Sequence, residues 1–181
     1  MENVLIIATS LSEDSKSQRL ARKFASHLRE QSVPCELVDL RELNLPFAGK
    51  EDSWEGAEIV SLREKIVASS HIVFSVPIYC YDVNAAAKNV IELAGRCFTK
   101  KVVGFMCTAG GRNSYMSVMG LANHLMIDFR SVIVPRFVYA VTSDWIDGEM
   151  LTPEIEGRLQ VLLEDMKSIQ VNSANDGELG N

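Results

Sequence analysis

Short hydrophobic runs alternate with longer amphipathic stretches along this chain. Continuous apolar runs, rich in β-branched residues, occupy residues 3–9, 35–39, 71–76 and 101–107, with two shorter pieces at 132–134 and 137–141 around Pro135. Runs of this length and kind predict strands that are buried on both faces. Apolar residues recur at intervals of three and four at 18–31, 57–69, 83–97, 114–126 and 153–169, which predicts helices.

Strands and helices therefore alternate about five times. The strands are continuous apolar runs, without alternation of apolar and polar residues. This combination predicts an α/β fold in which helices cover both faces of a parallel sheet. The stretch 41–56 has no clear period and is expected to be a loop, and Pro77 is expected to end the third strand. We expect one domain over residues 1–170 and a disordered tail at 171–181, where the sequence turns polar and contains glycine.

The charge balance and the hydropathy exclude several classes of function. The formal net charge is −6 and no Lys/Arg cluster is present, so no nucleic acid partner is expected. No apolar run has the length of a membrane span, so no membrane association is expected. The start of the chain also lacks the basic segment and the cleavage site of a signal peptide, which favours the cytoplasm.

Cysteine and histidine are too sparse to build a metal centre. The four cysteines, Cys35, Cys80, Cys97 and Cys107, form no C-x-x-C pair, and the chain has only three histidines. We therefore expect free thiols, no disulfide framework and no metal site.

Ligands of open parallel sheets bind beyond the carboxyl ends of the strands, where the strand order reverses. The first loop at such an end is crowded with hydroxyl groups, from Thr9, Ser10, Ser12, Ser15 and Ser17. A helix that starts there offers free backbone N–H groups to a phosphate, and hydroxyls add donors. Serine is also the ordinary N-cap residue, so the run fits either a phosphate cradle or a plain helix start. The loop has no glycine, which excludes the Walker A and the dinucleotide G-x-G-x-x-G patterns.

Two further loops follow the third and the fourth strand. The second loop offers flat apolar surface from Tyr79 and Tyr81, together with Pro77, Ile78 and Cys80. The third contains Thr108 and the pair Gly110 and Gly111, which lets the backbone approach a ligand closely. Taken alone, each loop also fits an ordinary cap of the sheet.

Two of these segments resemble the NAD(P)H-dependent FMN reductase family. Residues 9–17, TSLSEDSKS, resemble its phosphate loop G-S-x-R-x-x-S-x-N, with serines matching at 10 and 15 and Ser12 standing where the family has arginine. Residues 77–92 are similar to its P-x-Y-N-x-x-x-P-x-x-L-K-N-x-I-D, with Cys80 at the asparagine position and Asn84 at the second proline. The family commonly has a Gly-Gly pair in the third loop as well.

The resemblance implies a flavodoxin-like fold, with a five-stranded sheet in the order 2-1-3-4-5. It implies FMN as cofactor, NADPH or NADH as co-substrate, and a small electron acceptor such as flavin, a quinone or an azo compound. The implied FMN-binding residues are Thr9, Ser10, Ser12, Ser15, Ser17, Pro77, Ile78, Tyr79, Cys80, Tyr81, Thr108, Gly110 and Gly111. No catalytic side chain is implied, because hydride passes directly to the flavin.

The resemblance also implies a homodimer or a homotetramer, with the helix from Val83 and the helix at Val118 to Met126 as candidate contacts. Two alternatives stay open at this point. One is an electron carrier or FMN-binding protein that does not turn over NAD(P)H. The other is an interaction protein that has lost the cofactor.

Overall fold

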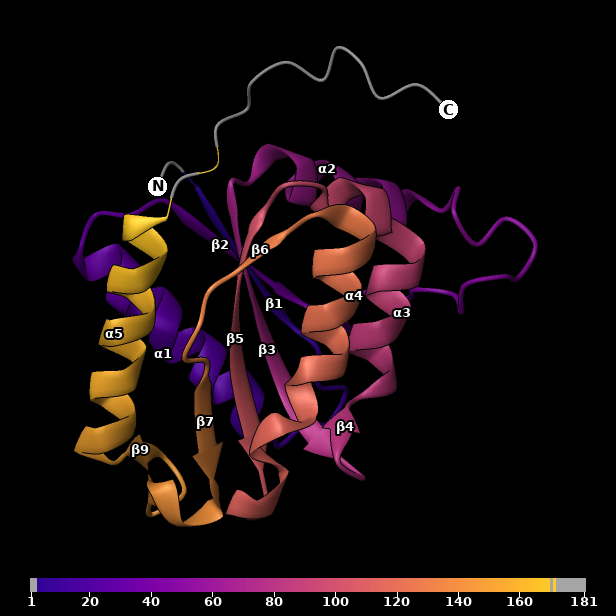
Figure 1. The fold of residues 1–181 in the computed structure, drawn as a ribbon. Helices are drawn as coiled ribbons and strands as arrows, with labels where there is room; N and C mark the ends of the chain where they lie inside the picture. The colour runs from indigo at the N-terminus through magenta and orange to yellow at the C-terminus, as the bar shows by residue number, and fades with distance from the viewer. Residues whose placement is uncertain (1–2, 170, 172–181) are drawn as a thin grey trace.

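A parallel sheet forms the centre of the molecule (Figure 1). The computed structural model describes residues 3–169 and residue 171. The main strands are β1 (Val4–Ala8), β2 (Cys35–Asp39), β3 (His71–Tyr79), β5 (Val102–Ala109), β6 (Val132–Ile133) and β7 (Val138–Val141). Their order is β2-β1-β3-β5, and β6 and β7 both pair with the outer side of β5. The predicted α/β class and the order 2-1-3-4-5 are confirmed.

The register brings the carboxyl ends of the central strands to one edge of the sheet. Val4 lies opposite both Cys35 and His71, and His71 lies opposite Val102. The strand order reverses between β1 and β3, because β2 lies on one side of β1 and all later main strands lie on the other. This is the switch point at which ligands bind in such sheets.

Helices cover both faces of the sheet, as the alternation predicts. The helices α1 (Lys16–Glu30) and α5 (Pro153–Ser168) lie on one face, and α2 (Ala57–Ala68), α3 (Ala85–Ala94) and α4 (Met119–Phe129) on the other (Figure 1). Each layer buries its own hydrophobic cluster, around Phe24 and Leu162 on the first face and around Phe74 and Phe105 on the second. A fully buried side chain of this size stabilises the fold by about 1.5–3 kcal/mol, so the two clusters fix the sheet that carries the loops.

Pro135 divides the outer strand into β6 and β7. Ile133 lies opposite Val103 and Val138 opposite Met106, so this strand uses more residues than β5 over the same length and bulges between them. Proline cannot donate to the ladder, and Arg136 adopts a positive φ of 61° beside it. The two strand pieces that the sequence predicts are therefore both present.

The structure corrects the boundaries of three predicted elements. The strand β3 passes through Pro77 to Tyr79, because β1 has already ended on the side of the missing N–H group. The next element is the short strand β4 (Asp82–Val83), which makes a hairpin with β3, so α3 begins later than predicted. A 3₁₀ segment, Arg112–Val118, precedes α4 and replaces the predicted start of that helix.

Three further segments lie outside the predicted helices and strands. The loop at 41–56 extends from the side of α2 and α3 (Figure 1), and the 3₁₀ turn Leu40–Glu42 overlaps its start. A second hairpin, β8 (Trp145–Ile146) and β9 (Met150–Leu151), precedes α5. The predicted tail at 171–181 lies outside the described residues except for Val171.

Candidate functional site

The loops after β1, β3 and β5 meet in one crevice at the carboxyl edge of the sheet. A cavity of about 230 Å³ is lined by Ser10, Ser12, Ser15, Pro77, Ile78, Tyr79, Thr108 and Gly110, among others. An adjoining cavity of about 260 Å³ is lined by Ile78, Cys80, Tyr81, Gly110 and Gly111, among others. Because the two share Ile78 and Gly110, we treat them as one crevice. All predicted site residues except Thr9 and Ser17 line it.

Thr9 and Ser17 instead hold the loops in place. The Thr9 hydroxyl donates to Oδ1 of Asn84 at 2.7 Å, and Nδ2 of Asn84 donates to the Thr9 carbonyl at 2.7 Å. Ser17 shares a 2.9 Å hydrogen bond with the hydroxyl of Ser15, and its carbonyl accepts from Ser75 at 2.7 Å. Both residues are fully buried. They therefore shape the crevice without facing it.

The helix α1 directs its N-terminus into the crevice. Ser15 is the N-cap, and its hydroxyl accepts a hydrogen bond from the backbone N–H of Gln18 at 3.3 Å. The first-turn N–H groups of Lys16 and Ser17 have no acceptor within the helix, as at every helix start. The first turn contains no acidic residue. The arrangement is suited to an anion, because these N–H groups and the helix dipole both favour negative charge.

Arg41 braces the first loop from the end of β2. Its guanidinium donates to the carbonyls of Ser12 at 3.4 Å and Glu13 at 3.2 Å, and it forms an ion pair with Asp39. Gln18 donates to the same carboxylate at 2.6 Å. Burial would raise the pKa of Asp39, but the hydrogen bonds and charge of Arg41 outweigh it and hold that pKa below its ordinary value. The carboxylate is thus charged and fully engaged.

The second loop is a tight hairpin turn with unusual residues at its tip. Tyr79 pairs with Asp82, so Cys80 and Tyr81 are the two central residues, with φ values of 51° and 62°. A two-residue turn with positive φ at both positions normally carries Asn-Gly, because other side chains are strained there. Tyr79 and Tyr81 are 54% and 68% exposed, so the turn presents two flat rings beside the crevice.

Two side-chain contacts fix the third loop, one with β7 and one with the 3₁₀ turn Thr142–Asp144 that follows it. The Tyr139 hydroxyl donates to the carbonyl of Gly111 at 2.7 Å and lies 2.7 Å from the Ser114 hydroxyl. Arg112 donates to the buried carboxylate of Asp144 at 2.7 Å, so this arginine is engaged in a structural ion pair. A Cβ atom added at Gly110 or Gly111 would meet nothing within 4 Å. The loop backbone is therefore open to close approach by a ligand.

Several residues of the crevice were missed by the sequence reasoning. Asp14, Lys16 and Thr142 also line it, and Asn84, Asp39 and Arg41 support its loops. Lys16 and Asp14 lie inside the hydroxyl-rich run, so their position offered a signal. Thr142 follows β7 and carried no motif, since only the folded sheet brings it to this edge.

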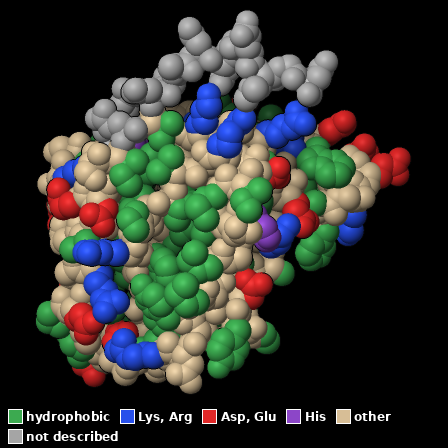
Figure 2. All heavy atoms as spheres, in the orientation of Figure 1, with side chains coloured by type: hydrophobic (Ala, Val, Ile, Leu, Met, Phe, Trp, Pro, Cys, Tyr) green, Lys and Arg blue, Asp and Glu red, His purple; other side chains and the backbone are tan. Residues whose placement is uncertain are grey.

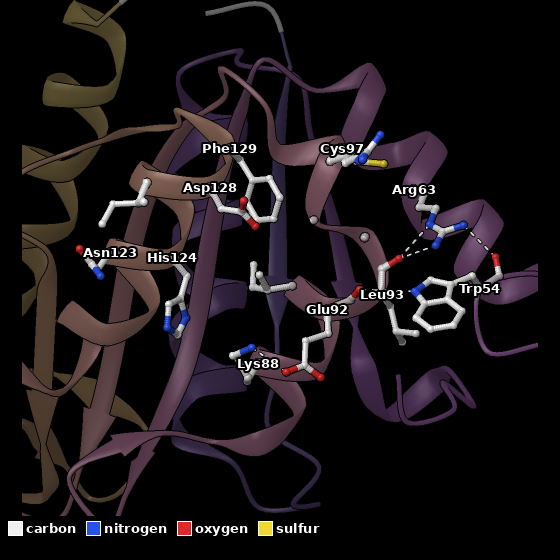
Figure 3. A pocket seen from close by; sticks show the side chains of 15 residues that line it. Trp54, Arg63, Lys88, Glu92, Leu93, Cys97, Asn123, His124, Asp128 and Phe129 are labelled. Carbon is white, nitrogen blue, oxygen red and sulfur yellow. Dashed lines mark hydrogen bonds and ion pairs between the residues drawn. The ribbon is translucent and has the colours of Figure 1, made fainter. Parts of the chain in front are cut away.

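A larger hollow of about 790 Å³ lies between α3 and α4, away from the crevice (Figure 3). Lys88 and Glu92 project into it from α3, and His124 and Asp128 from α4. One end is closed by Trp54 and Arg63, which donate to the carbonyls of Glu92 and Leu93. No residue of this hollow lines the crevice.

The described part of the chain contains neither a helix that could span a membrane nor a cluster of metal ligands. None of its helices combines the length and the apolar character that crossing a bilayer requires. Within residues 3–169 and 171, no three His, Cys, Asp or Glu side chains lie close enough together to hold a metal ion.

Known flavin-dependent reductases are similar to this chain along most of its length. An FMN-dependent NADPH-azoreductase of Staphylococcus aureus is 27% identical over an alignment of 183 positions, which covers 93% of this chain and 95% of the relative. An NAD(P)H-dependent FAD/FMN reductase of Geobacillus thermodenitrificans is 25% identical over 133 residues, 72% of each chain.

Solved structures share the fold. An NAD(P)H:(acceptor) oxidoreductase from Paracoccus denitrificans superimposes with a TM-score of 0.73 at 18% identity, over 93% of this chain and 98% of that one. The family model described as NADPH-dependent FMN reductase matches residues 3–145, which include all three loops of the crevice. The chain belongs to the NADPH-dependent FMN reductase family.

Proposed function

We propose that this protein holds FMN in the crevice and reduces small acceptors such as free flavin, quinones or azo compounds at the expense of NADPH or NADH. Family membership supports the cofactor and the nicotinamide, and an azoreductase and a flavin reductase are among the relatives. The observation that carries the proposal is the meeting of three loops, from β1, β3 and β5, in one crevice at the switch point of the sheet. FMN, when bound, supplies the redox chemistry by accepting hydride and passing electrons on.

The α1 end of the crevice is suited to the phosphate of FMN. Ser10, Ser12 and Ser15 line it with hydroxyl groups, beside the free N–H groups of the first turn. Thr9 and Ser17 contribute through the hydrogen bonds that hold this loop. The serine run thus fits a cradle as well as a cap, since only Ser15 is needed as the N-cap.

The other end of the crevice is suited to the flat ring of FMN. Cys80 and Tyr81 form the tip of the hairpin turn, and Pro77, Ile78 and Tyr79 line the crevice from the end of β3. Gly110 and Gly111 leave room for a ring edge to reach the backbone, and Thr108 adds a hydroxyl. The protein residues orient the ring and shield it, and we assign no acid–base role to any of them.

We further propose that the protein acts in the cytoplasm as a homodimer or homotetramer. The four cysteines are free thiols, which agrees with a reducing compartment. The outer face of α4 exposes Met119, Met126 and Ile127 beside the hollow. Figure 2 shows hydrophobic side chains gathered in the middle of this face of the molecule. An apolar patch of this kind is suited to a second copy of the chain.

An absorbance spectrum followed by a nicotinamide assay tests the proposed function. We expect the purified protein to bind FMN that heating releases, and to oxidise NADPH or NADH when flavin, a quinone or an azo dye is added. Bound FMN without nicotinamide oxidation would favour the electron carrier instead. Failure to bind FMN even after reconstitution would favour the interaction protein.

A further inference from the structure

The first loop lacks the arginine that the family usually has in its phosphate loop, since Ser12 occupies that position. The structure places a different cation at the crevice. Lys16, the first residue of α1, lines the same cavity as Ser10, Ser12 and Ser15. We infer that Lys16 binds the phosphate of FMN and makes the protein select FMN over riboflavin. This inference rests on the proposed function.

The charges around Lys16 leave it available for a ligand. Asp14 lines the same cavity, but its carboxylate is paired with Arg19, which also donates to the carbonyl of Gly148. Arg41 is engaged with Asp39 and the loop carbonyls. Within the described residues, Lys16 has neither an ion pair nor a side-chain hydrogen bond. It is thus the cation of this loop that can neutralise an incoming anion.

The position of Lys16 is unfavourable unless an anion is present. The positive end of a helix dipole repels a cation in the first turn. The helices α2 and α5 have acidic residues in their first turns, whereas α1, α3 and α4 have none, and of these three only α1 begins with a cation, Lys16. A phosphate bound between the first-turn N–H groups and the ammonium group would offset this repulsion.

A second polar side chain without a protein partner lines this cavity, independently of Lys16. The Thr108 side chain is only 6% exposed and lines the cavity that Lys16 lines. In the part of the chain that the structure describes, its hydroxyl has no hydrogen-bond partner. The hydroxyl is not among the fully enclosed polar atoms, so it is open to the crevice and can bond to a ligand bound there.

Flavin titrations test the assignment. FMN and riboflavin differ only in the phosphate, and binding of either is followed by quenching of flavin fluorescence. For Lys16→Gln we expect FMN to bind about tenfold more weakly or worse, and riboflavin to bind as in the wild type, because only the phosphate contact is lost. The dependence of FMN affinity on salt concentration becomes less steep in the variant.

Two further variants and a melting curve distinguish a lost phosphate contact from a general loss of stability. Lys23→Gln is the matched control, because Lys23 lies on the same helix but pairs with Glu156 at 2.9 Å and does not line the crevice. The double variant Ser12→Arg/Lys16→Gln returns a cation to the position where the family has it, and we expect FMN affinity to recover. The Lys16→Gln protein without flavin should melt no lower than the wild type.

Three outcomes count against the assignment. Unchanged FMN affinity in Lys16→Gln, or an equal loss for FMN and riboflavin, overturns the role of Lys16 while leaving the proposed function intact. Wild-type protein that binds neither FMN nor riboflavin overturns the proposed function itself and this assignment with it.

Discussion

Single hydrogen-bonding side chains set the geometry of the crevice. Asn84 bonds to Thr9 across 75 positions of the sequence, and so joins the loops after β1 and β3. Tyr139 holds the carbonyl of Gly111, and Arg41 holds that of Ser12. Each of these residues contacts another loop rather than lining the crevice. Substitution of these residues can therefore impair ligand binding although none of them lines the crevice.

At Asp39, the contribution of such a supporting side chain to stability can be measured as a function of pH. Its pKa is lower in the folded protein than the ordinary value of 3.8, so the charged form stabilises the fold. That stabilisation is present above pH 3.8 and is lost as the pH falls through the lower, folded value. We expect Asp39→Asn to lower the free energy of unfolding by about 1–3 kcal/mol at pH 7.

Urea unfolding of both proteins between pH 7 and pH 3 gives the measurement. The difference between wild type and Asp39→Asn should shrink as the solution becomes more acidic, and FMN binding should weaken in the variant at pH 7. Glu36→Gln on the same strand, whose carboxylate is about half exposed, is the control and should change little. A difference that grows toward pH 3 would contradict the assignment.

At the level of elements, the β3–β4 hairpin combines strain with exposure. Non-glycine residues with positive φ cost about 1–2 kcal/mol each, and here Cys80 and Tyr81 are adjacent. The hairpin is held by only two residue pairs and contacts the 3₁₀ segment before α4. Strained residues of this kind cluster at binding sites, which agrees with the place of the turn beside the crevice.

Replacing the tip with the residues that the turn prefers should separate stability from binding. We expect Cys80→Asn/Tyr81→Gly to raise the free energy of unfolding by about 1 kcal/mol or more and to weaken FMN binding. Urea unfolding and flavin titration measure the two effects. A less stable variant would show that the side chains of Cys80 and Tyr81 contribute more than their backbone strain costs.

The contact between α4 and the 3₁₀ turn Gly95–Phe98, which directly follows α3, depends on Gly95. A Cβ atom there would lie 2.3 Å from Cζ of Phe129, at the end of α4. Gly95→Ala must displace that ring and should lower the free energy of unfolding by about 1–3 kcal/mol. Gly157→Ala in α5 is the matched control, because nothing lies within 4 Å of its added methyl group.

We expect Gly157→Ala to stabilise the protein by about 0.5–1 kcal/mol, since alanine is the better helix former. Thermal and urea unfolding of the two single variants provide the comparison. Equal effects of the two substitutions would argue against a tight contact between Gly95 and Phe129.

On the scale of the whole molecule, the crevice and the α3–α4 hollow lie at different places on the surface. The crevice lies at the carboxyl edge of the sheet, whereas the hollow lies between two helices that cover one face (Figure 3). The hollow has the larger volume, but its Arg63 donates to the carbonyls of Leu93 and Trp54 and its Lys88 is paired with Glu92. We therefore propose FMN in the crevice and a second copy of the chain on the apolar outer face of α4 beside the hollow.

The oligomeric state tests the second assignment. Ile127 is 74% exposed on α4, and we expect Ile127→Asp to convert the proposed dimer or tetramer to smaller species because it places a charge in an apolar contact. Light scattering coupled to size-exclusion chromatography measures the mass. Val161→Asp on α5, which covers the opposite face, is the control and should leave the mass unchanged. A wild-type monomer would refute the proposal.

The sequence by itself determined the layers and the chemistry of the loops. Buried apolar strands alternating with amphipathic helices predict a covered parallel sheet, because each pattern follows from which faces are hidden from water. Hydroxyl-rich and glycine-containing loops at strand ends then indicated where a phosphate and a ring could lie. These are local signals, and all of them are readable along the chain.

Only the tertiary structure decided which loop side chains face the crevice and which hold it together. Thr9 and Ser10 are adjacent hydroxyl residues, yet Thr9 bonds to Asn84 while Ser10 lines the cavity. Likewise, Pro77 lies within β3 because β1 has ended beside it, and Lys16 and Thr142 reach the same crevice from α1 and from the end of β7. These outcomes depend on contacts between residues far apart in the sequence, which hydrophobic periodicity does not encode.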